Sequence, residues 1–327
     1  MHLDSVNALD EITENYSLPI IYIITPTANH ITQRAHLTRI AQTLALVPNV
    51  RWIVVEDTNE PSSKVENILR NSRHPYAHLW IHKEYNESVG HYRGSVQRNL
   101  GIAWLRNAFY TGQLSISTIY SKSISMNDGL NSTSPAFYTQ MASNFEYMYR
   151  KSTNPFNLNN PKYLGNTNVW QDNLGNKNGV VYFADDDNTY DLDIFNQMRD
   201  IKKVGVWPVA LCGGVYAEKP LVKEGKVTGW LVAYAKERPI ATDMAGFAVN
   251  LKLLLRNKDV YFIELHESGS LESNFVERLV DIQDLEPLAD NCTKILVWHT
   301  QTRQPNLELE SNFIKMYNVS SNKDIEI

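Results

Sequence analysis

Strand-like and helix-like segments alternate along residues 18–82, and this alternation limits the possible folds more than any other feature. Short segments rich in Ile, Val and Tyr predict three strands, over residues 18–25, 50–55 and 78–82. Pro26 is expected to stop the first strand. Residues 31–46 and the segment entered at Pro61 carry apolar side chains at helical spacing. Such alternation favours a parallel sheet with helices on its faces, so the expected fold class is α/β.

A further buried strand, over residues 180–184, ends abruptly in Asp185, Asp186 and Asp187. Ligands of parallel sheets bind beyond the carboxyl ends of the strands, and Asp57 occupies the end of another expected strand. Three adjacent carboxylates repel one another, and a hard divalent cation such as Mg or Mn, often with a phosphate, is the usual compensation. A solvated acidic turn is the alternative, but the strand leading into the triplet favours a metal site.

The rest of the chain is less regular. Residues 107–178 break the alternation and become rich in Asn, Gly and Pro, which predicts a long insertion that does not build the core. Further strands are expected over residues 204–211, 227–234 and 295–298, and a helix is expected from Ser270. His299 directly follows the last of these strands. No order is predicted beyond Gln304.

Composition excludes several classes of protein. A length of 327 residues with 43% hydrophobic content describes an ordinary globular protein of one large or two moderate domains. The net charge of −5 argues against nucleic acid as the main partner, although local basic patches stay possible. Cys212 and Cys292 form no CxxC pair, and whether they are bonded stays open. Residues 1–17 form a polar tail unlike a signal peptide, and no run of about 20 apolar residues is present.

Several common site motifs are absent from the sequence. It contains no GxGxxG, Walker A, HExxH or GxSxG segment, and its His residues show no ligand spacing, so the acidic triplet is the single metal candidate. Asp185, Asp187 and Thr189 do fit the short signature of haloacid-dehalogenase-type phosphatases, with Asp185 as nucleophile. That signature normally opens its domain, whereas here it lies 180 residues into the chain.

Longer segments resemble the animal β-1,3-glucuronyltransferases of glycosyltransferase family 43. The matching segments follow the family order and are IYIITPT (21–27), QTLALVPNVRWIVVED (42–57), RGSVQRN (93–99), GVVYFADDDNTY (179–190), VGVWPVAL (204–211), DMAGFAV (243–249), GSLES (269–273) and NCTKILVWHT (291–300). The resemblance implies a GT-A fold, in which residues 18–207 bind the donor UDP-glucuronate with Mn²⁺ and residues 208–327 bind a galactose-terminated glycan. It also implies a homodimer and a type II membrane protein of the Golgi lumen, although no anchor segment is recognised in this sequence.

The resemblance also assigns roles to individual residues. Asp187 is expected to ligate Mn²⁺, Asp186 to contact the ribose, and Asp185 to act from behind the metal ligand. The remaining donor contacts are expected from Pro26, Asp57, Arg93, Arg98 and His299. Glu272 matches the catalytic base, and its place in a first helical turn is expected to keep it ionised. Acceptor or glucuronate contacts are expected from Glu218, Arg238 and Asp243, and Asn291 is the expected glycosylation site.

Two departures leave alternatives open. Ala28 stands where the family usually has a Tyr that stacks on uracil, and Gln301 stands where an Arg often contacts phosphate. These changes would suit a non-catalytic glycan-binding relative, whereas Asp187 and Glu272 favour an enzyme. Arg93 and Arg98, taken from their own segment alone, would be two solvated surface arginines. The expected acceptor is the galactosyl-galactosyl-xylose linker of proteoglycans, with N-acetyllactosamine as the alternative.

Overall fold

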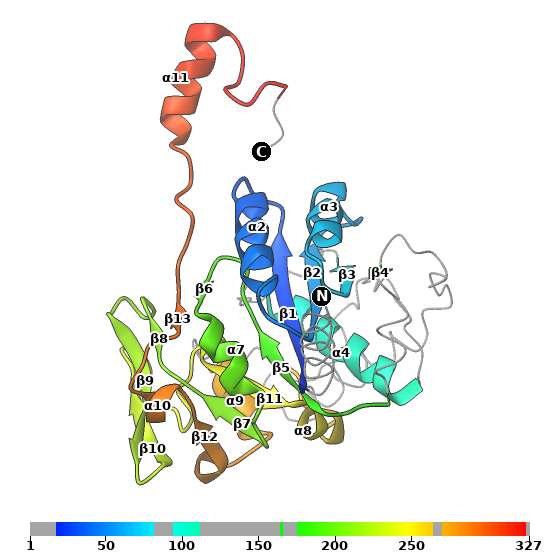
Figure 1. Ribbon diagram of the computed structural model, residues 1–327. Coiled ribbons are helices and arrows are strands. Elements are labelled where there is room, and N and C mark those ends of the chain that lie inside the picture. Colours follow the sequence, from blue (N-terminus) through cyan, green and yellow to red (C-terminus); the bar gives the residue numbers. More distant parts are fainter. Residues whose placement is uncertain (1–17, 82–93, 112–163, 166–174, 264–269, 325–327) are drawn as a thin grey trace, which may run out of the picture.

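The computed structural model describes residues 18–81, 94–111, 164–165, 175–263 and 270–324, and its centre is an eight-stranded sheet (Figure 1). Its strands in chain order are β1 (Ile20–Ala28), β2 (Val50–Asp57), β3 (Tyr76–Ile81), β4 (Leu164–Gly165), β5 (Gly179–Phe183), β7 (Val204–Val206), β11 (Phe247–Asn250) and β12 (Leu285–Pro287). Across the sheet the order is β12-β7-β11-β5-β1-β2-β3-β4. Strands β5, β1, β2 and β3 are mutually parallel, which confirms the expected α/β class.

Helices cover both faces of this sheet (Figure 1). They are α2 (Gln33–Leu44), α3 (Ser63–Asn71), α4 (Ser95–Thr111), α7 (Leu192–Met198), α8 (Leu251–Arg256) and α9 (Leu271–Glu277). Successive residues of β1 point to opposite faces, because side chains alternate along a strand. Ile21 and Ile23 pack with residues of α2, α3 and α7, whereas Tyr22 and Ile24 pack with residues of α4, α8 and α9. The central strands are therefore buried on both sides, as their continuous apolar sequences predict.

A second sheet of five short strands lies beside the first. Its members are β6 (Thr189–Tyr190), β8 (Val209–Ala210), β9 (Ala217–Lys223), β10 (Lys226–Leu231) and β13 (Val297–Trp298), in the order β10-β9-β8-β13-β6. β10 pairs antiparallel with β9, as expected for residues 227–234, although the strand ends at Leu231. β13 pairs with both β6 and β8, so the segment after the acidic triplet lies beside the one that leads to His299.

Pro26 does not stop β1, which continues to Ala28. The carbonyl of Ile24 accepts a hydrogen bond from the N–H of Ala184, so Ile24 faces the β5 side of the strand. Pro26, two residues further, faces the same side, but β5 has already ended at Phe183. The N–H that proline lacks is therefore not needed there, and the expectation was wrong because it ignored which neighbour the proline faces.

The long segment over residues 107–178 is described only in part. α4 continues to Thr111 and buries Ala108 and Phe109 in the core, so the core extends beyond residue 107. β4 pairs with the edge strand β3. Ser134 and Pro135 predict the start of a further helix, and this segment lies outside the described residues. The main sheet also takes β11 and β12 from residues beyond 207, so both halves of the chain contribute to it.

The chain ends in a helix that the sequence pattern does not predict, α11 (Leu307–Tyr317). The side chain of Asn306 caps it by accepting from the N–H groups of Glu308 and Leu309. None of its residues is buried, and Figure 1 shows it at the end of an extended segment, clear of the sheet. Short elements complete the described chain: the 3₁₀ helices η1 (Met244–Gly246) and η2 (Ile282–Asp284), and α10 (Ala289–Cys292).

Two further findings concern the cysteines and the possibility of a membrane-spanning helix. Cys212 and Cys292 are both buried and free, so they do not pair. Within the described ranges, no helix combines the length and apolar character needed to cross a membrane.

Candidate active site

The acidic triplet follows β5 in a turn whose backbone is held by side chains. The hydroxyl of Tyr190 donates to the carbonyl of Asp185 at 2.7 Å, and the hydroxyl of Thr300 donates to the carbonyl of Asp187 at 2.8 Å. Arg39 of α2 also donates to the carbonyl of Asp187. Three side chains therefore donate hydrogen bonds to the backbone carbonyls of Asp185 and Asp187, and these bonds fix the backbone that carries the three carboxylates.

Each carboxylate of the triplet has its own partners. Asp185 forms an ion pair with Arg98, in the first turns of α4. Asp186 is buried and accepts a hydrogen bond from the hydroxyl of Thr27, at the end of β1, at 2.7 Å. Asp187 is half-buried, and no described residue forms an ion pair with it. The fold therefore separates three neighbouring carboxylates into one that is paired with a cation, one that is hydrogen-bonded and one that is left without a cation.

The triplet carries more negative charge than its surroundings compensate. Burial raises the pKa of Asp186 to about 7, and the charges of Asp187 and Asp185 add to the rise. Burial and Asp185 also raise the pKa of Asp187, although His299 and Arg39 lower it in part. Carboxylate oxygens are the ligands that Mg²⁺ and Mn²⁺ prefer. This donor set and its charge deficit fit a divalent cation at Asp187.

The fold also brings together two histidines that the sequence pattern does not connect. Ligand atoms of His30, His36 and Asp186 lie within 4.8 Å of one another. The Nε2 atom of His36 accepts from the backbone N–H of Thr302 at 3.3 Å, so the proton of the neutral ring is on Nδ1, which faces Asp186 Oδ1 at 3.9 Å. Burial, with His30 and Arg39, lowers the pKa of His36 to about 4 and keeps the ring neutral. A protonated Nδ1 cannot ligate a metal, so in this tautomer His36 faces Asp186 without forming a hydrogen bond to it.

Glu272 lies in the first turn of α9, on the other side of the site. The helix is tied down by the hydroxyl of Ser273, which donates to the carbonyl of Ile240 at 2.6 Å. Burial raises the pKa of Glu272 to about 7, and Asp243 raises it further, whereas Arg98 and Arg238 lower it. The helix N-terminus was expected to keep this carboxyl ionised, but its effect does not hold the pKa at the usual value. α9 has seven residues, and its dipole is outweighed by desolvation and a neighbouring acid.

Asp243 interacts electrostatically with both Glu272 and Asp185 of the triplet. It caps η1 by accepting from the N–H of Ala245 at 2.9 Å. Its pKa is raised by burial and by the charges of Asp185 and Glu218, and it is lowered by that hydrogen bond and by His299. The backbone N–H of His299 donates to the carbonyl of Ala210 at 2.8 Å, which places His299 after β13. Residues from four separate parts of the chain therefore interact at one site.

The two remaining acceptor candidates lie on the second sheet and the loop that follows it. Glu218 on β9 accepts from the N–H of Ala233 at 2.8 Å. Gly213 leaves room for it, since a Cβ there would lie 2.3 Å from Glu218 Oε1, and its φ of +59° also favours glycine. Arg238 donates to the carbonyls of Ala235 and Tyr234, and its charge acts on Glu272.

The uridine candidates lie where β1 and β2 end. Asp57 is in register with Ala28, the position at which the sequence departs from its resemblance. A Cβ on Gly94 would lie 3.2 Å from Pro26 Cγ and 2.7 Å from Arg98 Nη1, so Pro26 and Arg98 flank the same glycine. Arg93 lies outside the described residues. Asn291 is exposed, in keeping with its expected role as a glycosylation site.

Comparisons with known proteins identify the family of this chain. A family model described as Glycosyltransferase family 43 matches residues 40–120 and 136–303. Galactosylgalactosylxylosylprotein 3-beta-glucuronosyltransferase 1 of Rattus norvegicus is 38% identical over 300 residues, which are 89% of this chain and 71% of that protein. Galactosylgalactosylxylosylprotein 3-beta-glucuronosyltransferase 2 of Homo sapiens is 36% identical over 299 residues, which are 90% of this chain and 73% of that protein.

Solved structures give a weaker match. S. aureus TarS 1-349 has a TM-score of 0.41 and 14% identity, covering 86% of this chain and 60% of that chain. The same protein in complex with UDP has a TM-score of 0.43 and 14% identity, covering 86% and 61%. This chain spans about three fifths of the length of those structures.

Proposed function

Because this chain belongs to glycosyltransferase family 43, and is a glycosyltransferase, we propose that it transfers glucuronate from UDP-glucuronate to the 3-hydroxyl of a terminal β-galactose, with inversion and with Mn²⁺ as cofactor. The observation that carries the proposal is the juxtaposition of two sets of carboxylates. An undercompensated triplet can take a metal and a diphosphate, and Glu272, with a pKa of about 7, can take a proton beside it.

The triplet and its neighbours hold the donor. Asp187 would hold the Mn²⁺ ion, which when bound neutralises the charge that develops on the departing diphosphate. Asp186, fixed by Thr27, would accept a hydrogen bond from the ribose. Asp185 keeps the Arg98 guanidinium on the donor side. Uridine would bind at Pro26 and Asp57, His299 would donate to the diphosphate, and Arg93 is proposed as a further cation there.

Glu272 carries the proton chemistry. The acceptor O3 attacks the anomeric carbon, the bond from that carbon to the diphosphate oxygen breaks, and UDP leaves with the electron pair. The proton of the 3-hydroxyl passes to the Glu272 carboxylate. A pKa near the working pH suits a general base, since the base is then both ionised and sufficiently basic. Arg238 suits the glucuronate carboxylate, and Glu218 and Asp243 would accept from sugar hydroxyls.

The proposed acceptor is the galactosyl-galactosyl-xylose linker, because the relatives named above carry that trisaccharide in their names. N-acetyllactosamine is the alternative acceptor. A homodimer in the Golgi lumen accompanies this proposal, and the exposed sequon at Asn291 suits a secretory compartment. The phosphatase hypothesis is less favoured, because its nucleophile, Asp185, is held in an ion pair with Arg98.

The test is UDP release from UDP-glucuronate with Mn²⁺ and a digalactoside acceptor. We expect Glu272→Gln to lower kcat by about a thousandfold, since general-base catalysis and its charge are both lost. Calorimetry should show that this variant still binds UDP with Mn²⁺. Undiminished transfer by the folded variant would refute the proposed base, and an absence of metal-dependent UDP binding by the unmodified protein would favour the non-catalytic relative.

A further inference from the structure

The segment that follows β13 runs along one side of α2 and is hydrogen-bonded to it. The backbone N–H of Thr302 donates to Nε2 of His36 at 3.3 Å, and the side-chain amide of Gln304 donates to the hydroxyl oxygen of Thr32 at 3.1 Å. As this segment advances by two residues, its partner on α2 moves back by four, so the two run in opposite directions. Residues 300–304 therefore form a brace along this side of α2.

The brace reaches the acidic triplet at Thr300. The hydroxyl of Thr300 donates to the carbonyl of Asp187 at 2.8 Å, and Arg39 of α2 donates to the same carbonyl. Because the proton of the Thr300 hydroxyl is engaged there, the hydroxyl of Thr189 is the donor in the 2.9 Å contact between the two threonines. Two successive hydrogen bonds therefore lead from Thr189 through Thr300 to the backbone of the proposed metal ligand.

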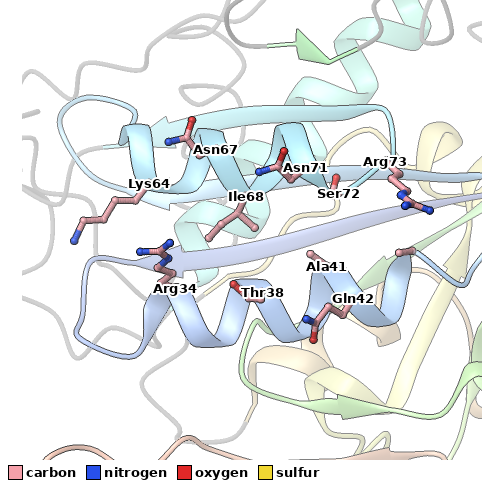
Figure 2. A pocket seen from close by; sticks show the side chains of 11 residues that line it. Arg34, Thr38, Ala41, Gln42, Lys64, Asn67, Ile68, Asn71, Ser72 and Arg73 are labelled. Carbon is pink, nitrogen blue, oxygen red and sulfur yellow. The ribbon is translucent and has the colours of Figure 1, made fainter. Parts of the chain in front are cut away.

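The residues of α2 that take part form a single stripe along the helix. Thr32, His36 and Arg39 are separated by four and three residues, a spacing that places them on the same side of a helix. Thr38 directly precedes Arg39 but lies on a different side, where it lines a groove between α2 and α3 together with Gln42 (Figure 2). One flank of α2 therefore faces α3, and another flank faces the brace and the triplet.

The backbone of Asp187 depends on these contacts because it belongs to neither sheet. β5 ends at Phe183 and β6 begins at Thr189, so Asp187 lies in the turn between the two strands. Its carbonyl is held by Thr300 and Arg39 instead of by a neighbouring strand. A metal site binds well only while its ligands are held within about 0.5 Å of the required geometry. A displacement of this backbone would move the Asp187 carboxylate with it.

We infer that Thr300 is a positioning residue for the divalent cation: it fixes the backbone of Asp187 to the brace and thereby sets the affinity of the site for Mn²⁺. This inference rests on the proposed function, which assigns Mn²⁺ to Asp187. Arg39 contributes to the same fixation, but its charge repels a cation, so removing Arg39 would change the affinity in two opposite directions. Thr300 is neutral, and its substitution therefore isolates the positioning effect. Because coupling between two sites is reciprocal, the bound metal stabilises the brace in turn.

The test compares the Mn²⁺ affinity of three variants of the full chain in the presence of UDP, measured from the electron paramagnetic resonance signal of the free ion. Thr300→Val keeps the shape of the side chain and removes the hydroxyl, whereas Thr300→Ser keeps the hydroxyl. Thr38→Val makes the same chemical change on the flank of α2 that faces α3. We expect about tenfold weaker Mn²⁺ binding in Thr300→Val, as for the loss of one hydrogen bond, and normal binding in the other two variants.

Three further measurements separate positioning from a general structural role. The affinity of Thr300→Val for UDP without metal should equal that of the unmodified protein. Thr189→Val should weaken Mn²⁺ binding by about twofold and add nothing in the Thr300→Val background, since Thr189 acts through Thr300. Compared with UDP alone, Mn²⁺ with UDP should slow amide hydrogen exchange in residues 300–306 of the unmodified protein, and it should do so less in Thr300→Val.

Each other outcome contradicts a stated part of the inference. Equal Mn²⁺ affinity in Thr300→Val and the unmodified protein would overturn it, and so would a tenfold loss in Thr300→Ser or Thr38→Val. Equal weakening of UDP binding with and without metal would show that Thr300 is merely structural. An unmodified protein that binds no Mn²⁺ would overturn both the inference and the proposed cofactor. If Mn²⁺ binding follows the expected pattern but no glucuronate is transferred, the proposed function fails and the role of Thr300 stands.

Discussion

Two groups of buried carboxylates lie near the carboxyl ends of parallel strands, and they differ in how their charge is compensated. In the first, His78 on β3 is fully buried, with Nε2 at 3.0 Å from Glu56 and Nδ1 at 3.2 Å from Glu66. Burial alone would raise the pKa of both glutamates, but hydrogen bonds from His78 and other donors lower it overall. In the second, burial and mutual repulsion raise the pKa of Asp186 and Asp187.

The difference separates a structural cluster from a functional one. In the first group, His78 supplies the cation that Glu56 and Glu66 need. No further positive charge is required there. Asp186 and Asp187 have too few cationic partners among the described residues, and a ligand must supply the missing charge. Perturbed pKa values cluster at functional sites, and here the direction of the shift distinguishes the two groups.

The largest effect is expected from Asp187→Asn. If Asp187 holds the metal, kcat should fall by about a thousandfold, as when a main electrostatic contact in the transition state is removed. The melting temperature should stay the same or rise, because the carboxylate that is removed is uncompensated in the folded state.

The measurements are kcat and thermal unfolding with and without UDP and Mn²⁺. Asp200→Asn removes an exposed acid and should change neither. A large loss of stability in Asp187→Asn would mean that the carboxylate is structural, and the contrast between the two clusters would fail.

The opposite result is expected from His78→Ala, in the compensated cluster. Two buried glutamates would lose their shared cation, which should lower the free energy of unfolding by about 3 kcal/mol. Urea unfolding measures this change. The triple variant His78→Leu, Glu56→Gln, Glu66→Gln removes the whole charged group and should recover part of the loss. A cost below about 1 kcal/mol for His78→Ala would show that the cluster is not held by charge.

The smallest effect is expected from pH. The folded pKa of Glu272 is about 7, above its usual value, so the ionised base is lost as pH falls through 7. The rate should drop about tenfold per pH unit below that value and level off above it. The compensated glutamates have lowered pKa values, so their contribution to stability is present above their unfolded pKa and is lost only as pH falls further, through the lowered values. Profiles of kcat and of urea unfolding against pH should therefore separate, and coincident profiles would contradict the assignment.

The local sequence pattern determined much of the secondary structure of this protein and the position of the acidic triplet. The apolar periods of β1, α2, β2 and α3 predict those elements, because alternation and helical spacing are properties of neighbouring residues. The triplet is recognisable because a buried strand runs directly into three acids. The contact of His36 with Asp186 could not be found in this way, since the two residues are separated by 150 positions and are joined only by the path of the chain.

Other features were decided by the tertiary structure alone. β11 enters the main sheet between β5 and β7, antiparallel to both, which a four-residue apolar segment cannot indicate. Pro26 lies within β1 because β5 ends before reaching it. Glu272 has a pKa of about 7 because desolvation by burial, together with Asp243, outweighs the helix dipole. The sequence by itself determined which residues could do the chemistry. The tertiary structure decided which carboxylates are compensated, because compensation depends on distances between residues far apart in the chain.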